Sequence, residues 1–200
     1  MNNIPSNTTE NGTLIFYLEG LPGCGKTSIL ELMSKNYLIC PEIIIQENIS
    51  KFHNLSNQSF FLENDEQKQR IAEKSNATII VDRSPLSTFF FNLAKHTIDN
   101  NHYIDQITKW FNETIRPKIM KPNCHFIVLD IPAKLSLIRK NRNVNMSDPW
   151  ANPITLALIR KMYIEQSTRY PSKFILINGK LKLPDILLKV QKNISKYENR

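Results

Sequence analysis

A glycine-rich loop between a strand-like and a helix-like segment constrains this chain more than any other feature. Three of its five glycines lie within the six positions from Gly20 to Gly25, in the stretch EGLPGCGKTS. The residues before the loop, 13–19, are mostly apolar and rich in β-branched and aromatic types, which predicts a buried strand. The residues after it have the apolar spacing of a helix, so we expect the loop to connect a strand to a helix.

The loop matches the pattern Gly20-x-x-x-x-Gly25-Lys26-Thr27, which is typical of phosphate-binding loops in this position. Glycines let backbone N–H groups approach phosphate oxygens, and the helix N-terminus adds donors and partial positive charge. Lys26 is expected to reach the β- and γ-phosphates, and Thr27 to complete the shell of a Mg²⁺ ion. The alternative is a plain glycine turn. The predicted nucleotide-binding residues are Gly20, Gly23, Cys24, Gly25, Lys26, Thr27 and Ser28, with Cys24 as a small filler rather than a reactive thiol.

The remainder of the chain alternates strand-like and helix-like segments. Strands are expected over residues 37–40, 77–82, 125–130 and 173–178, and helices over 60–75, 85–100, 103–120, about 131–142, 154–170 and 184–197. This alternation indicates βαβ units, right-handed crossovers and a parallel sheet. No repeat or composition shift marks a second domain, so we expect one α/β domain over residues 13–200, after a polar, disordered leader over 1–12.

The formal net charge of +8 favours an anionic partner, which could be a nucleic acid, a membrane surface or a small phosphorylated ligand. The basic residues are scattered, so a solvated basic surface explains the charge equally well, and no aromatic–basic interleaving supports a nucleic-acid partner. Three widely spaced cysteines without a CxxC motif fit a reducing compartment. Neither a signal peptide nor an apolar run of ~18 residues is present. We therefore expect a cytoplasmic protein without a membrane partner.

A second motif, VDRSPLST, places Asp82 and Arg83 at the carboxyl end of the strand expected over 77–82. Open α/β sheets form their ligand crevice at that edge. An acid there can hold Mg²⁺ or its water, and an arginine can orient an acceptor or neutralise a transferring phosphoryl group. A solvated strand-end ion pair is the alternative. The Asn-Lys-x-Asp and Asp-x-x-Gly motifs of GTPases are absent, and no strand ends in the Asp-Glu pair of motor ATPases.

In sequence order, EGLPGCGKTS, CPE at Cys40 to Glu42, VDRSPLST and LDIPAKLSLIRKNR resemble the motifs of thymidylate kinases and deoxynucleoside kinases. The resemblance extends from about Thr13 to the last strand, FILING. It implies a P-loop NTPase-type three-layer sandwich, with a five-stranded parallel sheet and helices on both faces. It also implies ATP with Mg²⁺ as the donor, an arginine-bearing lid over about 139–153, a small nucleoside or nucleotide acceptor, and the homodimer that is common among such kinases.

The resemblance also assigns residues. Glu42 matches the strand-end carboxylate that deoxynucleoside kinases use as the base for the acceptor 5′-hydroxyl, with Glu47 as the second candidate and an exposed surface carboxylate as the alternative. Arg139 and Arg142 match the lid arginines. Their spacing of three predicts one helix face from which both could close over the phosphates, a basic helix C-terminus being the alternative. The predicted catalytic residues are Lys26, Glu42, Asp82, Arg83, Arg139 and Arg142, with Thr27 and Asp82 at the metal.

These motifs do not identify the acceptor. The run 82–84, Asp-Arg-Ser, is intermediate between the Asp-Arg-Tyr of thymidylate kinases and the Glu-Arg-Ser of deoxynucleoside kinases. Phe60, Phe61 and the run 89–91 could stack on a base, although three consecutive phenylalanines cannot face one side and core packing is favoured. The sequence thus predicts ATP- and Mg²⁺-dependent phosphoryl transfer to a nucleoside or nucleoside monophosphate. Another small hydroxyl acceptor and a nucleotide-binding regulatory ATPase are the alternatives.

Overall fold

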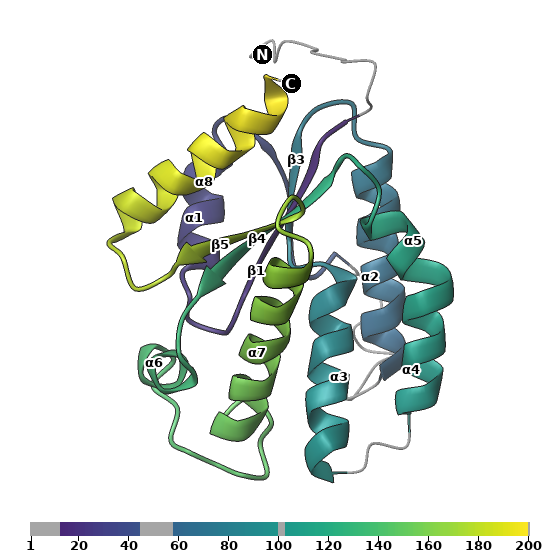
Figure 1. Ribbon diagram of the computed structural model, residues 1–200, viewed down its shortest axis with the longest axis vertical. Helices are drawn as coiled ribbons and strands as arrows, with labels where there is room; N and C mark the ends of the chain where they lie inside the picture. Colours follow the sequence, from purple (N-terminus) through teal and green to yellow (C-terminus); the bar gives the residue numbers. More distant parts are fainter. Residues whose placement is uncertain (1–12, 45–57, 100–102, 200) are drawn as a thin grey trace.

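Five parallel strands form one sheet in the computed structural model, which describes residues 13–44, 58–99 and 103–199. The predicted α/β architecture with a five-stranded parallel sheet is therefore confirmed. The predicted leader over 1–12 and the second candidate base, Glu47, lie outside the described residues. In the spatial order β2-β3-β1-β4-β5, the strands are β2 (Leu38–Cys40), β3 (Ile79–Asp82), β1 (Ile15–Gly20), β4 (Cys124–Asp130) and β5 (Phe174–Asn178) (Figure 1).

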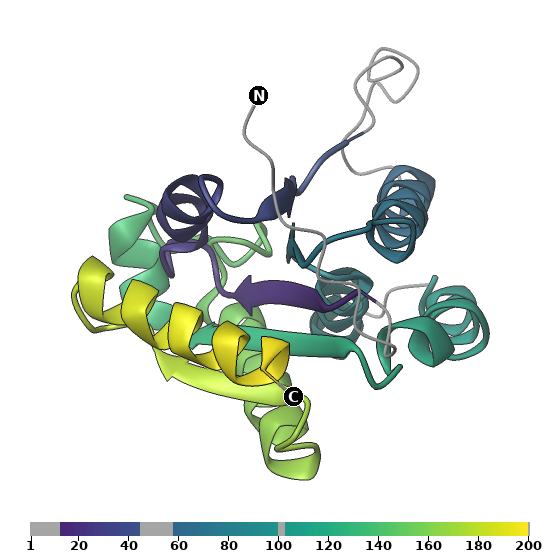
Figure 2. The ribbon, with the colours of Figure 1, turned by 90° about the horizontal axis from the view of Figure 1, so that it is seen from above.

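Helices cover both faces of this sheet, as the three-layer prediction required. Helices α1 and α8 contact each other on one face, and α3 contacts α2, α4 and α7 on the other. Figure 2 shows the molecule from above, with α1 (purple) and α8 (yellow) at the left and α2 and α3 (blue to teal) further to the right. The helices are α1 (Lys26–Met33), α2 (Gln58–Glu73), α3 (Pro85–Asp99), α4 (Ile104–Trp110), the π-helical η2 (Phe111–Ile115), α5 (Arg116–Ile119), α6 (Ala133–Arg139), α7 (Pro153–Arg169) and α8 (Leu183–Glu198). Within the described part of the chain, no helix is long and apolar enough to cross a membrane.

One helix ends earlier than its sequence pattern predicts. Helix α6 ends at Arg139, and Asn141 has a left-handed backbone with φ 50°. The N–H groups of Asn141 and Arg142 donate to the carbonyls of Ile138 and Leu137, each at 3.0 Å. This hydrogen-bond pair is the Schellman arrangement, in which asparagine is tolerated at the left-handed position. The prediction that Arg139 and Arg142 share one helix face is therefore wrong.

The sheet register brings the ends of three strands to one edge. All six residues of β1 are buried, as expected for a parallel strand with helices on both faces. Leu18 pairs with Asp82 and Gly20 pairs with Leu129, so β1 continues past the last residue of β3. The glycine loop therefore leaves the sheet beside the ends of both β3 and β4, where Asp82 and Asp130 lie.

Candidate active site

The three glycines of the loop all have positive φ angles: 134° at Gly20, 74° at Gly23 and 103° at Gly25. Residues with a side chain rarely adopt such angles. At Gly20 a Cβ would also lie 2.5 Å from the carbonyl oxygen of Leu129, and at Gly23 it would lie 3.1 Å from the Cβ of Arg139. At Gly25, which precedes α1, nothing lies within 4 Å of the added carbon. Gly20 and Gly23 thus allow close packing behind the loop, and Gly25 leaves open space in front of α1.

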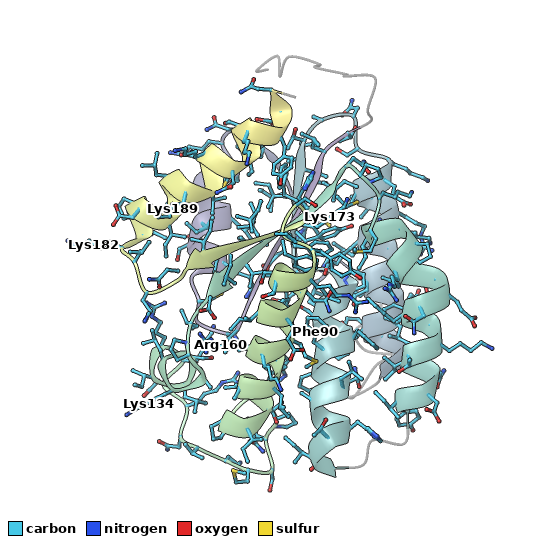
Figure 3. The ribbon with its side chains drawn as sticks, in the orientation of Figure 1. Phe90, Lys134, Arg160, Lys173, Lys182 and Lys189 are labelled. Carbon is cyan, nitrogen blue, oxygen red and sulfur yellow. The ribbon has the colours of Figure 1, made fainter. Side chains whose placement is uncertain are left out.

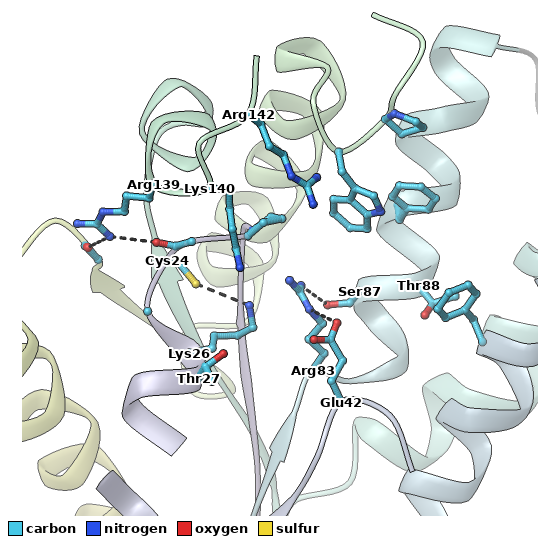
Figure 4. Close-up of a pocket in the computed structure, with 18 of the residues that line it drawn as sticks. Cys24, Lys26, Thr27, Glu42, Arg83, Ser87, Thr88, Arg139, Lys140 and Arg142 are labelled. Carbon is cyan, nitrogen blue, oxygen red and sulfur yellow. Dashed lines mark hydrogen bonds and ion pairs between the residues drawn. The ribbon is translucent and has the colours of Figure 1, made fainter. Parts of the chain in front are cut away.

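Lys26 is the first residue of α1, and its buried side chain folds back beneath the loop. Its Nζ donates to the Gly20 carbonyl at 3.4 Å and to the Cys24 thiol at 3.8 Å, both long contacts (Figure 4). Burial lowers the pKa of Lys26, and the nearby Arg83 lowers it further. An ammonium with little water and weak acceptors is prepared to bind an anion. Cys24 is buried, as a filling residue requires, and Thr27 is exposed beside Lys26.

Two strand-end carboxylates lie near the loop, and their hydrogen bonds distinguish them. Asp130 accepts two hydrogen bonds from Arg160 of α7, at 2.6 and 2.9 Å, which engage both of its oxygens (Arg160 is labelled in Figure 3). Asp82 instead has a buried Oδ1 atom without a hydrogen-bond partner. Burial raises the pKa of Asp82, while the charge of Lys26 opposes this shift. A buried carboxylate oxygen without a partner fits a cation or its bound water, so Asp82 is the better candidate for Mg²⁺.

The described residues contain no cluster of three or more His, Cys, Asp and Glu side chains that would form a protein-only metal centre. Mg²⁺ in nucleotide sites is commonly held by one or two protein oxygens together with phosphates and water. The Asp82 carboxylate and the Thr27 hydroxyl would supply two such protein oxygens. The donor set therefore fits Mg²⁺ bound together with a nucleotide.

Arg83 and Glu42 form an ion pair at the end of β3. Arg83 has a left-handed backbone with φ 61°, and its Nε lies 2.7 Å from Oε1 of Glu42. Its Nη1 also donates to the Gly20 carbonyl at 3.0 Å and to the Ser87 hydroxyl at 3.4 Å. Burial by itself would lower the pKa of Arg83, but the Glu42 carboxylate raises it above its ordinary value. The Glu42 side chain is 52% exposed, so an accessible carboxylate faces the same space as Lys26 (Figure 4).

A buried acid that the sequence analysis missed supports this corner. Glu19, the residue before the loop, is fully buried at the end of β1. Its Oε1 accepts from the backbone and hydroxyl of Ser84 at 2.8 and 2.5 Å, and its Oε2 accepts from Ser87 and Tyr163 at 2.6 and 2.7 Å. Burial and the charge of Glu19 raise the pKa of Tyr163 well above its ordinary value. An acid within an apolar strand was the only sequence signal for this network.

The two predicted lid arginines point in different directions. Nη1 of Arg139 donates to the carbonyls of Gly23 and Gly179, at 3.3 and 3.0 Å, so this side chain ties the loop to the connection after β5. Arg142 instead projects toward the cleft, and so does Lys140, which the sequence analysis did not select (Figure 4). All three side chains line the cleft, but Lys140 and Arg142 project into it, whereas Nη1 of Arg139 is held by the carbonyls of Gly23 and Gly179 (Figure 4).

The loop, the Glu42–Arg83 pair and the lid residues line one cleft of about 1790 Å³. Asp82 is not among the lining residues, but it lies close enough to Lys26 and Glu42 for their charges to affect its pKa. The half of the cleft away from the loop is lined by residues of α2, α3 and α4 and by two residues of the segment before α7, among them Phe61, Leu62, Thr88, Phe91, Asn92, Lys95, Gln106, Pro149 and Trp150.

The phenylalanines separate into core and cleft positions. Phe60 and Phe90 are buried in the core, and Phe89 stacks on Phe111 with ring centroids 4.1 Å apart. Phe61 and Phe91 line the cleft, and Phe91 stacks on Trp150 with centroids 4.5 Å apart. Core packing, which the sequence favoured for these rings, is confirmed for Phe60, Phe89 and Phe90, whereas Phe61 and Phe91 line the cleft.

Solved structures match this arrangement. Deoxyadenosine kinase from M. mycoides with bound dATP aligns with 91% of this chain and 100% of its own, at a TM-score of 0.69 and 15% identity. The chain has the fold of the P-loop nucleotide kinases. Thymidylate kinase from Ehrlichia chaffeensis aligns with 92% of this chain and 99% of its own, at a TM-score of 0.59 and 17% identity. No protein-family model and no curated protein was found to match the sequence. The resemblance predicted from the motifs is thus confirmed at the level of the fold.

Proposed function

We propose that this chain catalyses ATP- and Mg²⁺-dependent phosphoryl transfer to a hydroxyl group of a nucleoside. The observation that carries the proposal is the Glu42–Arg83 ion pair, which lies in the same cleft as Lys26 and the glycine loop. Structures of deoxyadenosine kinase that share this fold contain bound dATP, dCTP or dCMP, which supports a nucleotide as the ligand class.

In this proposal each residue acts at a defined atom of the reaction. Glu42 accepts the proton of the acceptor hydroxyl. The hydroxyl oxygen forms a bond to the γ-phosphorus of ATP while the bond between that phosphorus and the leaving oxygen of ADP breaks. Lys26 and the loop amides bind the donor phosphates, and Arg142 adds positive charge over them. Mg²⁺, when bound by Thr27 and Asp82, would neutralise phosphate charge. The chain thereby contributes positioning and charge stabilisation, which supply most of the catalysis of phosphoryl transfer.

The charges beside the acceptor favour a neutral hydroxyl over a phosphate. Two nitrogens of Arg83 already face protein oxygens, those of Glu42, Gly20 and Ser87. A dianionic phosphate placed beside this pair would meet the Glu42 carboxylate and few free donors on Arg83. A nucleoside is therefore the favoured acceptor, and a nucleoside monophosphate is the second.

The experiment is a panel of nucleosides, monophosphates and other small hydroxyl compounds, each incubated with the protein, ATP and Mg²⁺. We expect transfer to a nucleoside, and a decrease in kcat of about 10²- to 10⁴-fold in Glu42→Gln, the usual loss when a general base is removed. Glu31→Gln, which changes an exposed carboxylate of α1, is the matched control and should keep full activity. ADP release that is independent of every acceptor would overturn the proposal. Salt-sensitive nucleic-acid binding without transfer would support the regulatory ATPase instead.

Three sequence predictions complete the proposal: a lid over 139–153, a homodimer and a cytoplasmic location. The positions of Arg142, Lys140 and Trp150 along the cleft support the lid. Protection of this segment from limited proteolysis by a non-hydrolysable ATP analogue tests the lid. Sedimentation velocity tests the dimer.

A further inference from the structure

Lys68 is a buried cation that the proposed chemistry does not use. It lies in α2, and only 2% of its side chain is exposed. Lysine is rarely buried this completely unless it is paired, because removing an ammonium from water is costly. The nearest described carboxylate oxygen in an ion pair with it is Oδ1 of Asp65, which is 3.9 Å away. The closest contacts of Nζ are instead two backbone carbonyls.

Those two carbonyls belong to the corner that carries Arg83. Nζ of Lys68 donates to the carbonyl of Asp82 at 2.6 Å and to the carbonyl of Arg83 at 2.8 Å. Arg83 is in the left-handed region with φ 61°, a conformation that is strained for a residue with a side chain. One cation that binds two successive carbonyls stabilises the turn in which both oxygens point the same way. Lys68 is therefore placed to offset the strain at Arg83.

The other side of this corner is held by β1. The N–H of Arg83 donates to the Leu18 carbonyl at 3.1 Å, and the N–H of Ser84 donates to Glu19 at 2.8 Å. The β1 contacts fix the two N–H groups, and Lys68 fixes the carbonyls. Without Lys68, the carbonyl side of the turn would have no such cation to keep Arg83 left-handed and its guanidinium directed at Gly20 and Glu42.

Helix α2 also positions the second member of the pair. Asn64 lies one turn before Lys68, on the same helix face. Its Nδ2 donates to the Glu42 carbonyl at 2.9 Å, and its Oδ1 accepts from the N–H of Ile44 at 3.0 Å. One face of α2 thus contacts the backbone of both Glu42 and Arg83, which follow different strands, β2 and β3. The helix therefore holds together the two backbone segments that carry the ion pair.

We propose that Lys68 is a positioning residue for phosphoryl transfer, which holds the backbone at Arg83 left-handed so that the guanidinium faces Glu42. The inference rests on the proposed kinase function. It assigns to Lys68 an effect on kcat that is separate from its effect on stability. The loop and α1, which are proposed to bind the donor phosphates, receive no hydrogen bond from Lys68, whose Nζ donates to the carbonyls of Asp82 and Arg83. Binding of ATP is therefore expected to change little.

The test compares Lys68→Met with Gln69→Met. Gln69 is the next residue of α2, equally buried, and its Oε1 accepts from the Tyr17 hydroxyl at 2.5 Å, away from the corner. We expect both variants to lower the Tm. Only Lys68→Met should lower kcat, by about 10- to 100-fold, because small misplacements of reacting groups have effects of this size. The KM for ATP should be unchanged in both, and Lys68→Arg should recover part of kcat because it keeps the charge.

A second readout does not depend on activity. The Arg83 Nε–Hε signal in a ¹H–¹⁵N spectrum, assigned by its absence in Arg83→Lys, should shift or disappear in Lys68→Met and persist in Gln69→Met. An inactive wild type would overturn the proposed function, while this signal would still test the positioning. An unchanged kcat and an unchanged signal in folded Lys68→Met would overturn the inference. If Lys68→Met does not unfold cooperatively, Lys68→Gln replaces it and is judged by the same kcat and Arg83 signal. If neither variant folds, Lys68 maintains the fold rather than positioning Arg83, and the inference is overturned.

Discussion

Two glycine substitutions in the loop separate backbone strain from steric overlap. Gly20→Ala and Gly25→Ala both place a side chain at a positive φ, 134° and 103°. In Gly20→Ala the new carbon would also lie 2.5 Å from the Leu129 carbonyl oxygen and 2.9 Å from the Cys24 sulfur. In Gly25→Ala it would meet nothing within 4 Å. The two variants therefore share the strain and differ in the overlap.

The expected magnitudes follow from these contacts. The strained φ costs about 1–3 kcal/mol in either variant. Forcing a carbon against backbone in a packed region costs about a further 1–3 kcal/mol in Gly20→Ala alone. For a chain of this size, 1 kcal/mol corresponds to roughly 2–4 °C in Tm. Gly20→Ala should therefore melt roughly 2–12 °C below Gly25→Ala, and both should melt below the wild type.

Thermal melts followed by circular dichroism, with and without ATP and Mg²⁺, measure both effects. In the wild type, ATP at about 100 times its Kd should add about 2.7 kcal/mol to stability. Gly25→Ala should lose most of this increase, because its new methyl group occupies the open space in front of α1 where the phosphates are proposed to bind. Equal melting temperatures for the two variants would refute the overlap argument. A full ATP-induced increase in Gly25→Ala would refute the placement of the phosphates.

Three further substitutions test the charges of the site. Burial raises the pKa of the Asp65 carboxyl from 3.8 to about 6. Between pH 3.8 and pH 6 the folded state therefore binds more protons than the unfolded state, and the contribution of this carboxyl to stability falls as the pH rises. The difference in unfolding free energy between wild type and Asp65→Asn, from urea titrations, should therefore drop by about 2 kcal/mol from pH 4 to pH 6, and a flat difference would contradict the shift. Lys26→Met should raise the Tm without nucleotide, because burial disfavours the charged lysine, and should abolish the ATP-induced increase in Tm. A lower Tm of the variant without nucleotide would contradict the destabilising effect of the buried charge. Arg139→Ala should raise the KM for ATP with little change in kcat, because it removes the hydrogen bond to the loop carbonyl of Gly23. In steady-state kinetics, a lower kcat with an unchanged KM would show instead that Arg139 acts on the transferring phosphate.

The features that the sequence predicted well are local. The strands are short apolar runs, and the loop is a fixed spacing of glycines, lysine and threonine, so neighbouring residues determine both. The early end of α6 had a local signal as well, because Asn141 is a residue type that tolerates the left-handed position after a helix. Helical spacing through Arg142 outweighed that signal in the prediction.

The features that the sequence could not predict are contacts between distant residues. Glu19 accepts hydrogen bonds from Ser84 in the turn before α3, from Ser87 in α3 and from Tyr163 in α7. Helix α2 was predicted as a helix over 60–75, and the polar face of a helix usually points to solvent. Here Asn64 and Lys68 are buried and donate to the backbone of Glu42, Asp82 and Arg83 at the candidate active site. Periodicity shows that a helix has two faces but does not show which polar residues a neighbouring strand end will bury.

The concentration of buried charge at this edge of the sheet argues for function rather than stability. Glu19, Lys26, Asp65 and Lys68 are all buried around the ends of β1 and β3, and the side chain of Arg83 is 13% exposed. Well-packed apolar residues commonly match or exceed the stability of such groups, because desolvation offsets much of the attraction between charges. Fixed charges in a site with little water have a different advantage, since they stabilise charge that develops during a reaction without reorganising. A fold selected for stability alone would have filled this edge with apolar side chains, as it has filled the middle of β1. The charges are concentrated where the glycine loop leaves the sheet, which is where a transferring phosphoryl group would need them.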